Sequence, residues 1–313
     1  MPTDGPYALL DYPAYSNVGD NAIWLGTLEA FRRLGAGEPA YTCCILTYHA
    51  DSMRRRVGTG PIFVKGGGNF GDLYPAHQRL REQVAYDFPD NPIIQLPQTV
   101  RFDDEGGMAP ACAALGSHAD FTLMVRDRTS LELGRDRLGL RTLLAPDLAF
   151  LLSPPPPRDP PGKDVLWLLR ADAEAGTEDL VPRGDPVPVD WPTDAKGGLA
   201  RTQRHLTRSV ARNPREGFRA RRLRRTYDLL AEQRLAAGYA LLGSARFVVT
   251  DRLHGHLLCV LLGIPNVVLD NRYGKNRTLF EAWTHDIPTV RWAERDTEAV
   301  AQALAELRRR VNS

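Results

Sequence analysis

The sequence predicts an α/β fold in which two Rossmann-like domains face each other across a cleft. Short, continuous apolar runs alternate with segments of helical spacing, which is the pattern of a parallel sheet covered by helices on both faces. A proline-rich segment at 153–162 interrupts this alternation, which then resumes. With 313 residues, the chain is long enough for two domains of ordinary size. Ligands usually bind where such domains meet, at the carboxyl ends of the parallel strands.

The N-terminal domain is predicted over residues 1–152. Its strands are the apolar runs at Tyr7–Leu10, Tyr41–Leu46, Pro61–Val64, Pro92–Leu96 and Phe121–Val125. The spacing of apolar residues predicts helices within 20–34, 76–88 and 108–117. Because these strands are apolar throughout rather than alternating, we expect the sheet to be buried on both faces.

Residues 153–162 are predicted to form an extended linker, since proline removes backbone donors and stiffens the chain. A second domain is predicted over 163–293. Its clearest elements are strands at Val165–Leu169, Phe247–Thr250 and Asn266–Leu269 and a helix at Leu253–Leu262. Residues 294–313 are predicted to form a final helix that packs back across the domains.

Composition excludes several classes of protein. The net charge is only +2, which argues against a general nucleic-acid binder. No apolar run approaches the roughly 20 residues of a membrane helix, and no signal-peptide pattern precedes the first strand. The four cysteines are sparse and lack C-x-x-C spacing, so that we expect buried thiols and no zinc site. These features are typical of a cytoplasmic protein.

One segment is strongly basic, although the chain as a whole is nearly neutral. Residues Arg201–Arg225 contain ten arginines against one glutamate, a local charge of +9. Seven arginines recur every three or four residues, at Arg201, Arg204, Arg208, Arg212, Arg215, Arg219 and Arg222. This spacing predicts one helical face, which Pro214 and Gly217 divide into two helices. Two interpretations remain open: a solvated face, or a surface for an anionic partner such as the inner face of a membrane.

Two polar loops follow predicted strands of the first domain. In Asn17-Val18-Gly19-Asp20, the polar side chains either cap the next helix or form a polar wall at the top of the sheet. In Lys65–Asp72, three glycines precede Asn69. Either they form a flexible turn, or they let backbone N–H groups approach an anionic or sugar ligand.

The third loop, 249–256, gives the strongest functional signal. It places Arg252, Leu253, His254 and His256 at the N-terminus of a predicted helix, where free N–H groups attract phosphate or carboxylate. Arg252 adds a planar fork that suits either anion. His254 is a candidate acid or base, although the helix N-terminus and Arg252 both disfavour an imidazolium unless a substrate anion supplies a counter-charge. A purely structural role remains the alternative for each histidine.

Further basic residues follow other strands. Arg126, Arg170 and Lys275 stand at or just beyond strand ends, where each alone would be a solvated charge. Together they indicate an anion-binding funnel. No His, Asp or Glu cluster has the spacing of metal ligands, and no nucleophile motif of the G-x-S-x-G kind is present.

Seven motifs occur in a fixed order along the chain. They are N-V-G-D-N-A at 17–22, G-G-G-N-F-G-D at 66–72, V-R-D-R-T-S at 125–130, A-P-D-L-A-F at 145–150, T-D-R-L-H-G-H at 250–256, L-G-I-P at 262–265 and D-N-R-Y-G-K-N at 270–276. Together they resemble the polysaccharide pyruvyl transferase family, most closely its bacterial exopolysaccharide members. The resemblance extends from about residue 7 to 283, with a divergent part at about 172–240.

The resemblance implies a fold like that of GT-B glycosyltransferases and a transfer from phosphoenolpyruvate. The acceptor would be a sugar of a glycan or a lipid-linked oligosaccharide, and the product a pyruvate ketal on two of its hydroxyls. It implies donor contacts from Arg126, Arg252, Leu253 and His254 in this sequence, to which the need for fixed cations adds Lys275. The acceptor side would include Asn17, Asp20, Gly67, Gly68 and Asn69, together with Arg170.

This scheme requires no metal and no cofactor besides phosphoenolpyruvate as co-substrate. Two other functions remain open. A GT-B glycosyltransferase that uses a nucleotide sugar would have the same cleft and glycine-rich segment, although no acidic residue is clearly placed for a ribose. A non-catalytic protein that binds a glycan or nucleic acid through Arg201–Arg225 would not need the R-L-H-G-H motif.

Overall fold

A computed structural model describes residues 5–155, 160–172, 174–176, 180, 187–193, 197–215 and 217–311. Of the expected linker, residues 156–159 lie outside the described part. The chain divides into two compact units, hereafter unit 1 and unit 2. Unit 1 contains residues 1–16, 23–151 and 194–232, and unit 2 contains residues 17–22, 152–193 and 233–313.

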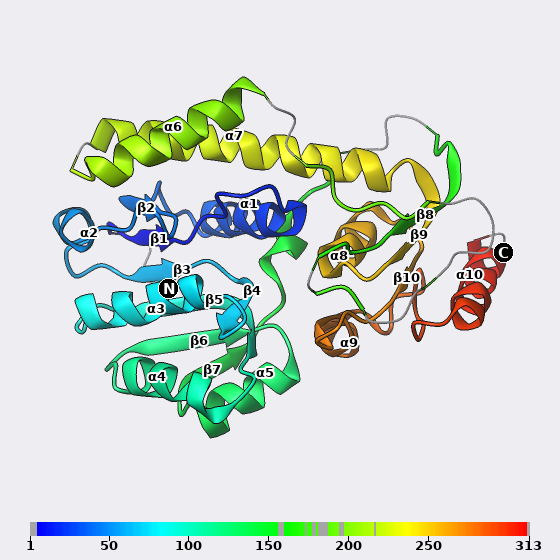
Figure 1. The fold of residues 1–313 in the computed structure, drawn as a ribbon, viewed down its shortest axis with the longest axis horizontal. Helices are drawn as coiled ribbons and strands as arrows, with labels where there is room; N and C mark the ends of the chain where they lie inside the picture. The colour runs from blue at the N-terminus through cyan, green and yellow to red at the C-terminus, as the bar shows by residue number, and fades with distance from the viewer. Residues whose placement is uncertain are drawn as a thin grey trace. The chain divides into compact units, whose positions relative to one another are not determined.

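Unit 1 is built on a sheet whose described strands are all parallel (Figure 1). The order is β2-β1-β3-β5-β6-β7. The first part of β5 pairs with β3, and its last part, from Gln98 to Arg101, pairs with β4. The strands are β1 (Ala8–Leu10), β2 (Tyr41–Cys43), β3 (Ile62–Val64), β4 (Gly67–Gly71), β5 (Ile93–Arg101), β6 (Phe121–Val125) and β7 (Arg141–Leu144).

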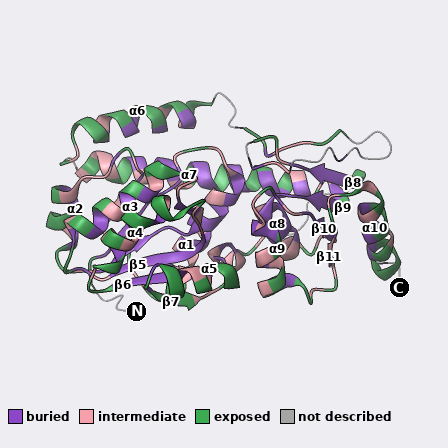
Figure 2. Cartoon of the chain, turned by 60° about the horizontal axis from the view of Figure 1, so that its bottom comes forward, coloured by how far each residue is buried: buried purple, intermediate pink, exposed green. Residues whose placement is uncertain are grey.

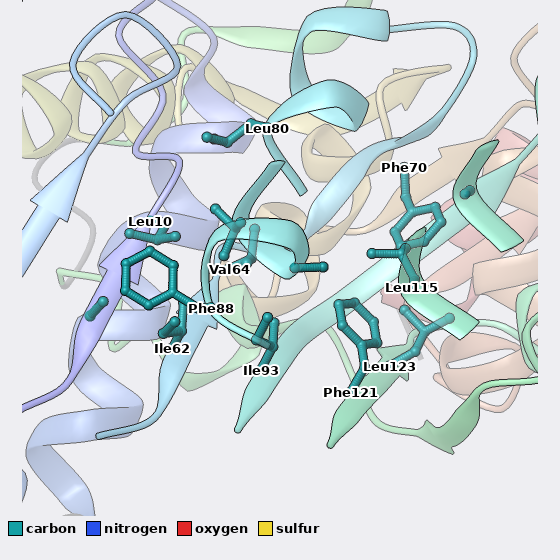
Figure 3. Close-up of a cluster of buried hydrophobic side chains, with 14 of the residues drawn as sticks. Leu10, Ile62, Val64, Phe70, Leu80, Phe88, Ile93, Leu115, Phe121 and Leu123 are labelled. Atoms are coloured by element: carbon teal, nitrogen blue, oxygen red, sulfur yellow. The ribbon is translucent and has the colours of Figure 1, made fainter. Parts of the chain in front are cut away.

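Helices cover both faces of this sheet. They are α1 (Val18–Arg33), α2 (Ala50–Val57), α3 (Pro75–Asp87), α4 (Glu105–Gly116), α5 (Arg128–Glu132), α6 (Gly198–Arg212) and the first part of α7 (Gly217–Leu242). Two apolar clusters hold the layers together. One joins strand residues such as Val64 and Ile93 to Leu80 of α3 and Leu115 of α4 (Figure 3). The burial of apolar strands on both faces explains their uninterrupted apolar sequence.

The second apolar cluster explains why α6 and α7 belong partly to unit 1. Leu206 and Val210 of α6 and Leu223 and Tyr227 of α7 pack with Trp24 of α1. This grouping differs from the expected boundaries, which placed these helices in a C-terminal domain over 163–293. Most arginines between 201 and 225 are exposed instead, so the apolar residues determined the packing. The break between the two predicted helices is confirmed, since α6 ends at Arg212 and α7 begins at Gly217.

Unit 2 has a smaller sheet, also parallel throughout its described strands. The order is β11-β10-β9-β8, formed by β8 (Lys163–Leu168), β9 (Ala245–Thr250), β10 (Asn266–Val268) and β11 (Val290–Trp292). Its further helices are α8 (Leu253–Leu262), α9 (Lys275–Leu279) and α10 (Thr297–Val311). Val300 and Leu307 of α10 pack against Phe247 and Val267 of this sheet. The final helix therefore covers part of its own unit. Its packing across the domains stays a prediction.

The predicted α/β class with parallel sheets is confirmed, and α8 has the bounds that the sequence predicts. The glycine-rich segment is the main local difference, because Gly67–Gly71 forms β4 instead of a loop. A Cβ at Gly66 would lie 2.3 Å from the Pro97 carbonyl oxygen, and one at Gly71 would lie 1.6 Å from that of Arg101. These two glycines therefore allow the chain to approach β5 closely.

Within the described part of the chain, no helix combines the length and the apolar composition needed to cross a bilayer.

Candidate functional site

The strongest sequence signal lies where β9 leads into α8. Arg252 occupies the N-cap position of α8, and its side chain makes no capping hydrogen bond, so the helix end keeps its attraction for an anion. A Cβ at Gly255 would lie 2.7 Å from Thr250 Oγ1 and 2.9 Å from Leu168 Cδ2. Gly255 therefore allows the first turn of α8 to pack against β8 and β9.

Two carboxylates hold the guanidinium of Arg252. Its Nε donates to Asp190 Oδ1 at 2.8 Å, Nη2 contacts Asp190 Oδ2, and Nη1 lies 3.2 Å from Asp172 Oδ2. Burial raises the pKa of Asp172, but the hydrogen bond from Arg170 and the charges of Arg170 and Arg252 outweigh it and leave the pKa below its usual value. An incoming anion therefore competes with the carboxyl groups of Asp172 and Asp190 for Arg252.

Arg170 and Lys275 join this cluster through the same acidic segment. Arg170 forms a two-pronged pair with Asp172 at 2.8 and 2.9 Å and lies 3.4 Å from Glu174. Lys275 Nζ donates to Glu174 Oε2 at 3.3 Å, and its side chain is only 7% exposed. Three of the predicted basic residues, Arg170, Arg252 and Lys275, are thus brought together in unit 2. Arg170, expected on the acceptor side, lies with the predicted donor contacts.

The D-N-R-Y-G-K-N segment positions Lys275. Asn271 Oδ1 accepts from the Lys275 backbone N–H at 3.1 Å, and Gly274 before it has a φ of 75°. Asn276 Nδ2 donates to the carbonyls of Asp251 and Leu269 at 2.6 and 2.8 Å. The Asn276 amide therefore links the residue after β9 to the residue after β10. These hydrogen bonds fix the turn that carries Lys275.

Asp251 stabilises the basic cluster through the backbone of Arg170. It is fully buried, accepts from the Arg170 backbone N–H at 2.8 Å and pairs with Arg295 at 2.9 Å. Burial raises the pKa of this carboxyl, while Arg295 and Arg170 oppose the rise. Asp251 therefore orients the strand end that carries Arg170.

His254 lies against the first turn of α1, within unit 2. A Cβ at Gly19 would be 2.5 Å from His254 Nδ1 and 2.8 Å from its Cβ. Asn17 caps the same turn, since its Oδ1 accepts from the Gly19 N–H at 2.9 Å and from the Asp20 N–H at 3.4 Å. Two motifs separated by more than 230 residues in the sequence thus meet, and Gly19 provides the space for the histidine.

His256 has a structural role. Its Nδ1 is 2.8 Å from Asn266 Oδ1, and its Nε2 is 2.9 Å from Thr284 Oγ1. Complete burial lowers its pKa to about 4, so that the imidazole is neutral near pH 7. With Oδ1 of Asn266 as acceptor, Nδ1 carries the hydrogen and Nε2 accepts from the threonine hydroxyl.

Arg126 belongs to unit 1 and has partners there. It is 2% exposed, donates to Thr99 Oγ1 at 3.0 Å and pairs with Asp147 at 2.5 Å. Asp127 caps α5 by accepting from the Ser130 N–H at 2.8 Å. The V-R-D-R-T-S and A-P-D-L-A-F motifs therefore meet in one buried ion pair.

Asn69, in β4, lies in a second polar cluster of unit 1. Its Oδ1 accepts from Gln98 Nε2 at 2.7 Å, and its Nδ2 donates to Asp11 Oδ2 at 3.3 Å. His77 and Arg81 of α3 complete the cluster. Gly67, expected beside a ligand, pairs with Gln98 of β5, and its neighbour Gly68 lies within the same strand.

Sequence reasoning missed the acidic residues of unit 2 and four members of the unit 1 cluster, which are Asp11, His77, Arg81 and Gln98. Asp172, Glu174 and Asp190 lie in or near the divergent part of the chain, where no motif marks them. The one available signal was that Asp172 and Glu174 follow β8 directly beside Arg170. Among the described residues, no group of three or more His, Cys, Asp or Glu side chains could hold a metal ion.

Comparison with known proteins gives consistent matches. The model of the polysaccharide pyruvyl transferase family matches residues 17–273. Pyruvyl transferase 1 of Schizosaccharomyces pombe is 32% identical, over 89% of this chain and 69% of that protein. The putative pyruvyl transferase EpsO of Bacillus subtilis is 29% identical, over 93% and 89%.

A crystal structure of an uncharacterised Klebsiella pneumoniae protein shares the fold. Its TM-score is 0.60 at 18% sequence identity, with 93% of each chain covered. The family match extends from the capped turn at Asn17 to Tyr273, next to the Lys275 turn. By this match, the chain belongs to the polysaccharide pyruvyl transferase family.

Proposed function

We propose that this chain transfers the enolpyruvyl unit of phosphoenolpyruvate to two hydroxyls of a saccharide and forms a pyruvate ketal. The observation that carries the proposal is the convergence of Arg252, Arg170 and Lys275 near the uncapped N-terminus of α8. Phosphoenolpyruvate carries a carboxylate and a phosphate on three carbons. A cluster of fixed cations at a helix N-terminus suits such a ligand.

The overall reaction balances without a redox step. The methylene carbon of the donor gains a proton and becomes a methyl group, while C2 forms bonds to two sugar oxygens. The bond from C2 to the phosphate oxygen breaks, and the two hydroxyls lose two protons. One of these two protons balances the proton that the methylene carbon takes up. The other is bound by the released phosphate.

His254 is the proposed acid that protonates the methylene carbon. It lies in the first turn of α8, beside the cation cluster in sequence and against the capped turn of α1. Donor anions near this helix end would supply the counter-charge that an imidazolium needs. Arg252, Arg170 and Lys275 would neutralise the departing phosphate.

Binding of the donor requires an exchange of partners. Since Asp172 and Asp190 occupy the guanidinium of Arg252, the donor must displace at least one of them. Asp172 is the more exposed, with 45% of its side chain accessible against 27% for Asp190. We therefore assign the displacement to Asp172. The GT-B-like pairing of the two units stays a prediction, as do the acceptor contacts of Asn17, Asp20, Gly67 and Gly68 and the donor contact of Arg126.

We also propose that the arginine face of α6 and α7 contacts an anionic membrane surface, where a lipid-linked acceptor would be found. Eight arginines of this face are exposed: Arg201, Arg204, Arg208, Arg212, Arg215, Arg221, Arg222 and Arg225. Phe218, between the two runs of arginines, is 70% exposed. Figure 2 shows exposed residues along α6 beside the buried ones that face its unit. Basic and aromatic residues together favour the lipid interface.

The test of transfer is mass spectrometry of a saccharide acceptor incubated with phosphoenolpyruvate and the protein. We expect the acceptor to gain the mass of one pyruvate less one water, with one phosphate released per product. Phosphate release without this gain in mass would contradict transfer, and transfer of a glycosyl mass from a nucleotide sugar would support the glycosyltransferase alternative.

A further inference from the structure

Arg295 lies outside the seven sequence motifs and beyond the family match, which ends at residue 273. It stands in the connection between β11 and α10 of unit 2. Its Nη1 donates to Oδ2 of Asp251 at 2.9 Å. The side chain of Arg295 is 14% exposed, and that of Asp251 is 0% exposed. The two residues therefore form a largely buried ion pair, which joins the chain after β11 to the chain after β9.

The same carboxylate also holds the backbone of Arg170. Oδ1 of Asp251 accepts from the Arg170 backbone N–H at 2.8 Å, while Oδ2 binds Arg295. Arg170 follows β8, and its side chain belongs to the basic cluster through its pair with Asp172. Because the two carboxylate oxygens bind different partners, a displacement of Arg295 would also displace the acceptor of the Arg170 N–H.

Arg295 contacts the segment that follows Arg170 as well. A Cβ at Gly176 would lie 2.7 Å from Arg295 Nε and 2.8 Å from its Cζ. The guanidinium therefore packs against the backbone at Gly176, where a side chain would not fit. Glu174, which pairs with Lys275, lies just before this glycine in the sequence. Arg295 thus contacts the chain after β9 and the chain after β8, which position the cations of the donor site.

Asp251 faces charged groups from two other segments. Arg295 comes from the connection before α10, and Arg170 comes from the chain after β8. From α9, the uncharged amide of Asn276 donates to the Asp251 carbonyl at 2.6 Å. Arg252 follows directly in the chain, and two other carboxylates hold its guanidinium. Among these groups, Arg295 pairs its guanidinium with the Asp251 carboxylate, whereas Arg170 binds it through the backbone N–H.

The charge of Arg295 affects how strongly Asp251 binds this N–H. Burial raises the pKa of the Asp251 carboxyl, because a buried charge loses its hydration, while Arg295 and Arg170 oppose the rise. Without Arg295 the pKa would rise further, and a fully buried carboxyl without its cation can stay protonated near pH 7. A neutral carboxyl accepts a hydrogen bond about half as strongly as a carboxylate does. Loss of Arg295 would therefore loosen the backbone of Arg170.

We propose that Arg295 is a positioning residue of the donor site and that, through its ion pair with Asp251, it fixes the chain from which Arg170 contacts phosphoenolpyruvate. This inference rests on the proposed function, since Arg170 contacts this donor only if phosphoenolpyruvate binds to unit 2. Arg295 acts through Asp251 and not by touching the donor. A residue beyond the family match thus contributes to the donor site.

Donor binding measured by calorimetry tests this role. We expect Arg295→Gln to weaken binding of phosphoenolpyruvate by about tenfold at pH 6, since it impairs one hydrogen bond to a charged group. The loss, always relative to the wild type at the same pH, should be smaller at pH 8, where more of Asp251 is ionised. Arg295→Lys keeps the charge and should restore most of the affinity. Wild-type affinity of Arg295→Gln at both pH values would overturn the proposal.

Arg291→Gln is the matched control. Arg291 is 17% exposed and pairs with Glu306 at 3.1 Å in the same unit. An equal loss of donor affinity in this variant would indicate a general effect on unit 2 and refute the role of Arg295. Should Arg295→Gln not fold, Asp251→Asn replaces it, because its amide leaves the Arg170 N–H a neutral acceptor. This variant should weaken donor binding by a similar factor at every pH, and wild-type affinity would overturn the proposal.

The backbone amide signal of Arg170 in NMR spectra tests the coupling without any donor. We expect its chemical shift to stay constant between pH 6 and pH 8 in the wild type and to change with pH in Arg295→Gln. The double variant Arg295→Gln with Asp251→Asn has no carboxyl to titrate and should give a constant signal. A constant signal in Arg295→Gln would overturn the coupling. The expected signals without binding of phosphoenolpyruvate by the wild type would contradict the proposed function and still support the hold of Arg295 on Arg170.

Discussion

Arg252 is the residue on which the donor site depends, and its partners illustrate what a sequence reveals. Its position at a helix N-terminus could be predicted because strand, turn and helix are local patterns. Its pairing with Asp172 and Asp190 could not be predicted. Asp190 lies 62 residues away in the sequence, in a segment without a helix or strand pattern. The contact of Gly19 with His254 likewise depends on tertiary packing alone.

Removal of the competing carboxylate should strengthen donor binding. Asp172→Asn keeps the size of the side chain but removes the charge that holds Arg170 and Arg252. We expect phosphoenolpyruvate to bind about tenfold more tightly, the equivalent of about 1.4 kcal/mol, as measured by calorimetry. Asp286→Asn, at an exposed aspartate of the same unit, is the control. Weaker or unchanged binding in Asp172→Asn would exclude the exchange of partners.

His254→Ala should abolish turnover while phosphoenolpyruvate still binds. A lost acid or base costs about 10²–10⁴-fold in rate. Gly19→Ala should show the same separation in milder form, because its methyl group would displace the imidazole. Initial rates and donor affinity measured on the same preparations check both variants. Near-normal rates in His254→Ala would end its assignment as the acid.

The lowered pKa of His256 predicts that the stability of the folded chain depends on pH. Its pKa is lowered from 6.5 to about 4 in the folded chain, so the unfolded chain binds more protons between these values. This contribution is present above pH 6.5 and is lost as the pH falls toward 4, by about 3 kcal/mol in total. Denaturant unfolding at several pH values should show a shallower decline for His256→Gln than for the wild type. Parallel declines would contradict the assignment.

At the scale of elements, local patterns predicted α8 and the apolar strands but not β4. The helix is delimited by Arg252 at its N-cap and by Gly263, whose φ of 68° ends it. The glycines of β4 have no side chains that could form a strand pattern. The strand forms because the chain at Gly66 and Gly71 approaches β5 closely. The arginine spacing of α6 and α7 predicted two helices, whereas their attachment to unit 1 depended on the apolar face.

The arginine face should bind anionic vesicles. We expect sedimentation with phosphatidylglycerol vesicles at low salt, less at physiological salt, and none with neutral vesicles. Replacement of Arg204, Arg208 and Arg212 by glutamine should weaken binding by roughly 1 kcal/mol for each charge. The matched control replaces the exposed Arg79, Arg141 and Arg309. An equal loss in both triple variants would indicate a general charge effect and refute a specific surface.

For the whole molecule, the central claim is that phosphoenolpyruvate is the donor and that Arg252 anchors it. The sequence alone left a nucleotide-sugar donor open, because a parallel α/β unit with a helix N-terminus serves either ligand. The proposal of phosphoenolpyruvate rests on Arg170, Arg252 and Lys275. They converge in unit 2, where Asp172, Asp190 and Glu174 pair with them.

The most direct test is the melting temperature of the wild type and of Arg252→Ala with phosphoenolpyruvate or UDP-glucose. A ligand that binds only the folded chain raises the melting temperature, and the rise grows with the ratio of ligand concentration to Kd. We predict a rise with phosphoenolpyruvate in the wild type, a much smaller rise in Arg252→Ala, and none with UDP-glucose. Stabilisation by UDP-glucose and not by phosphoenolpyruvate would contradict the account.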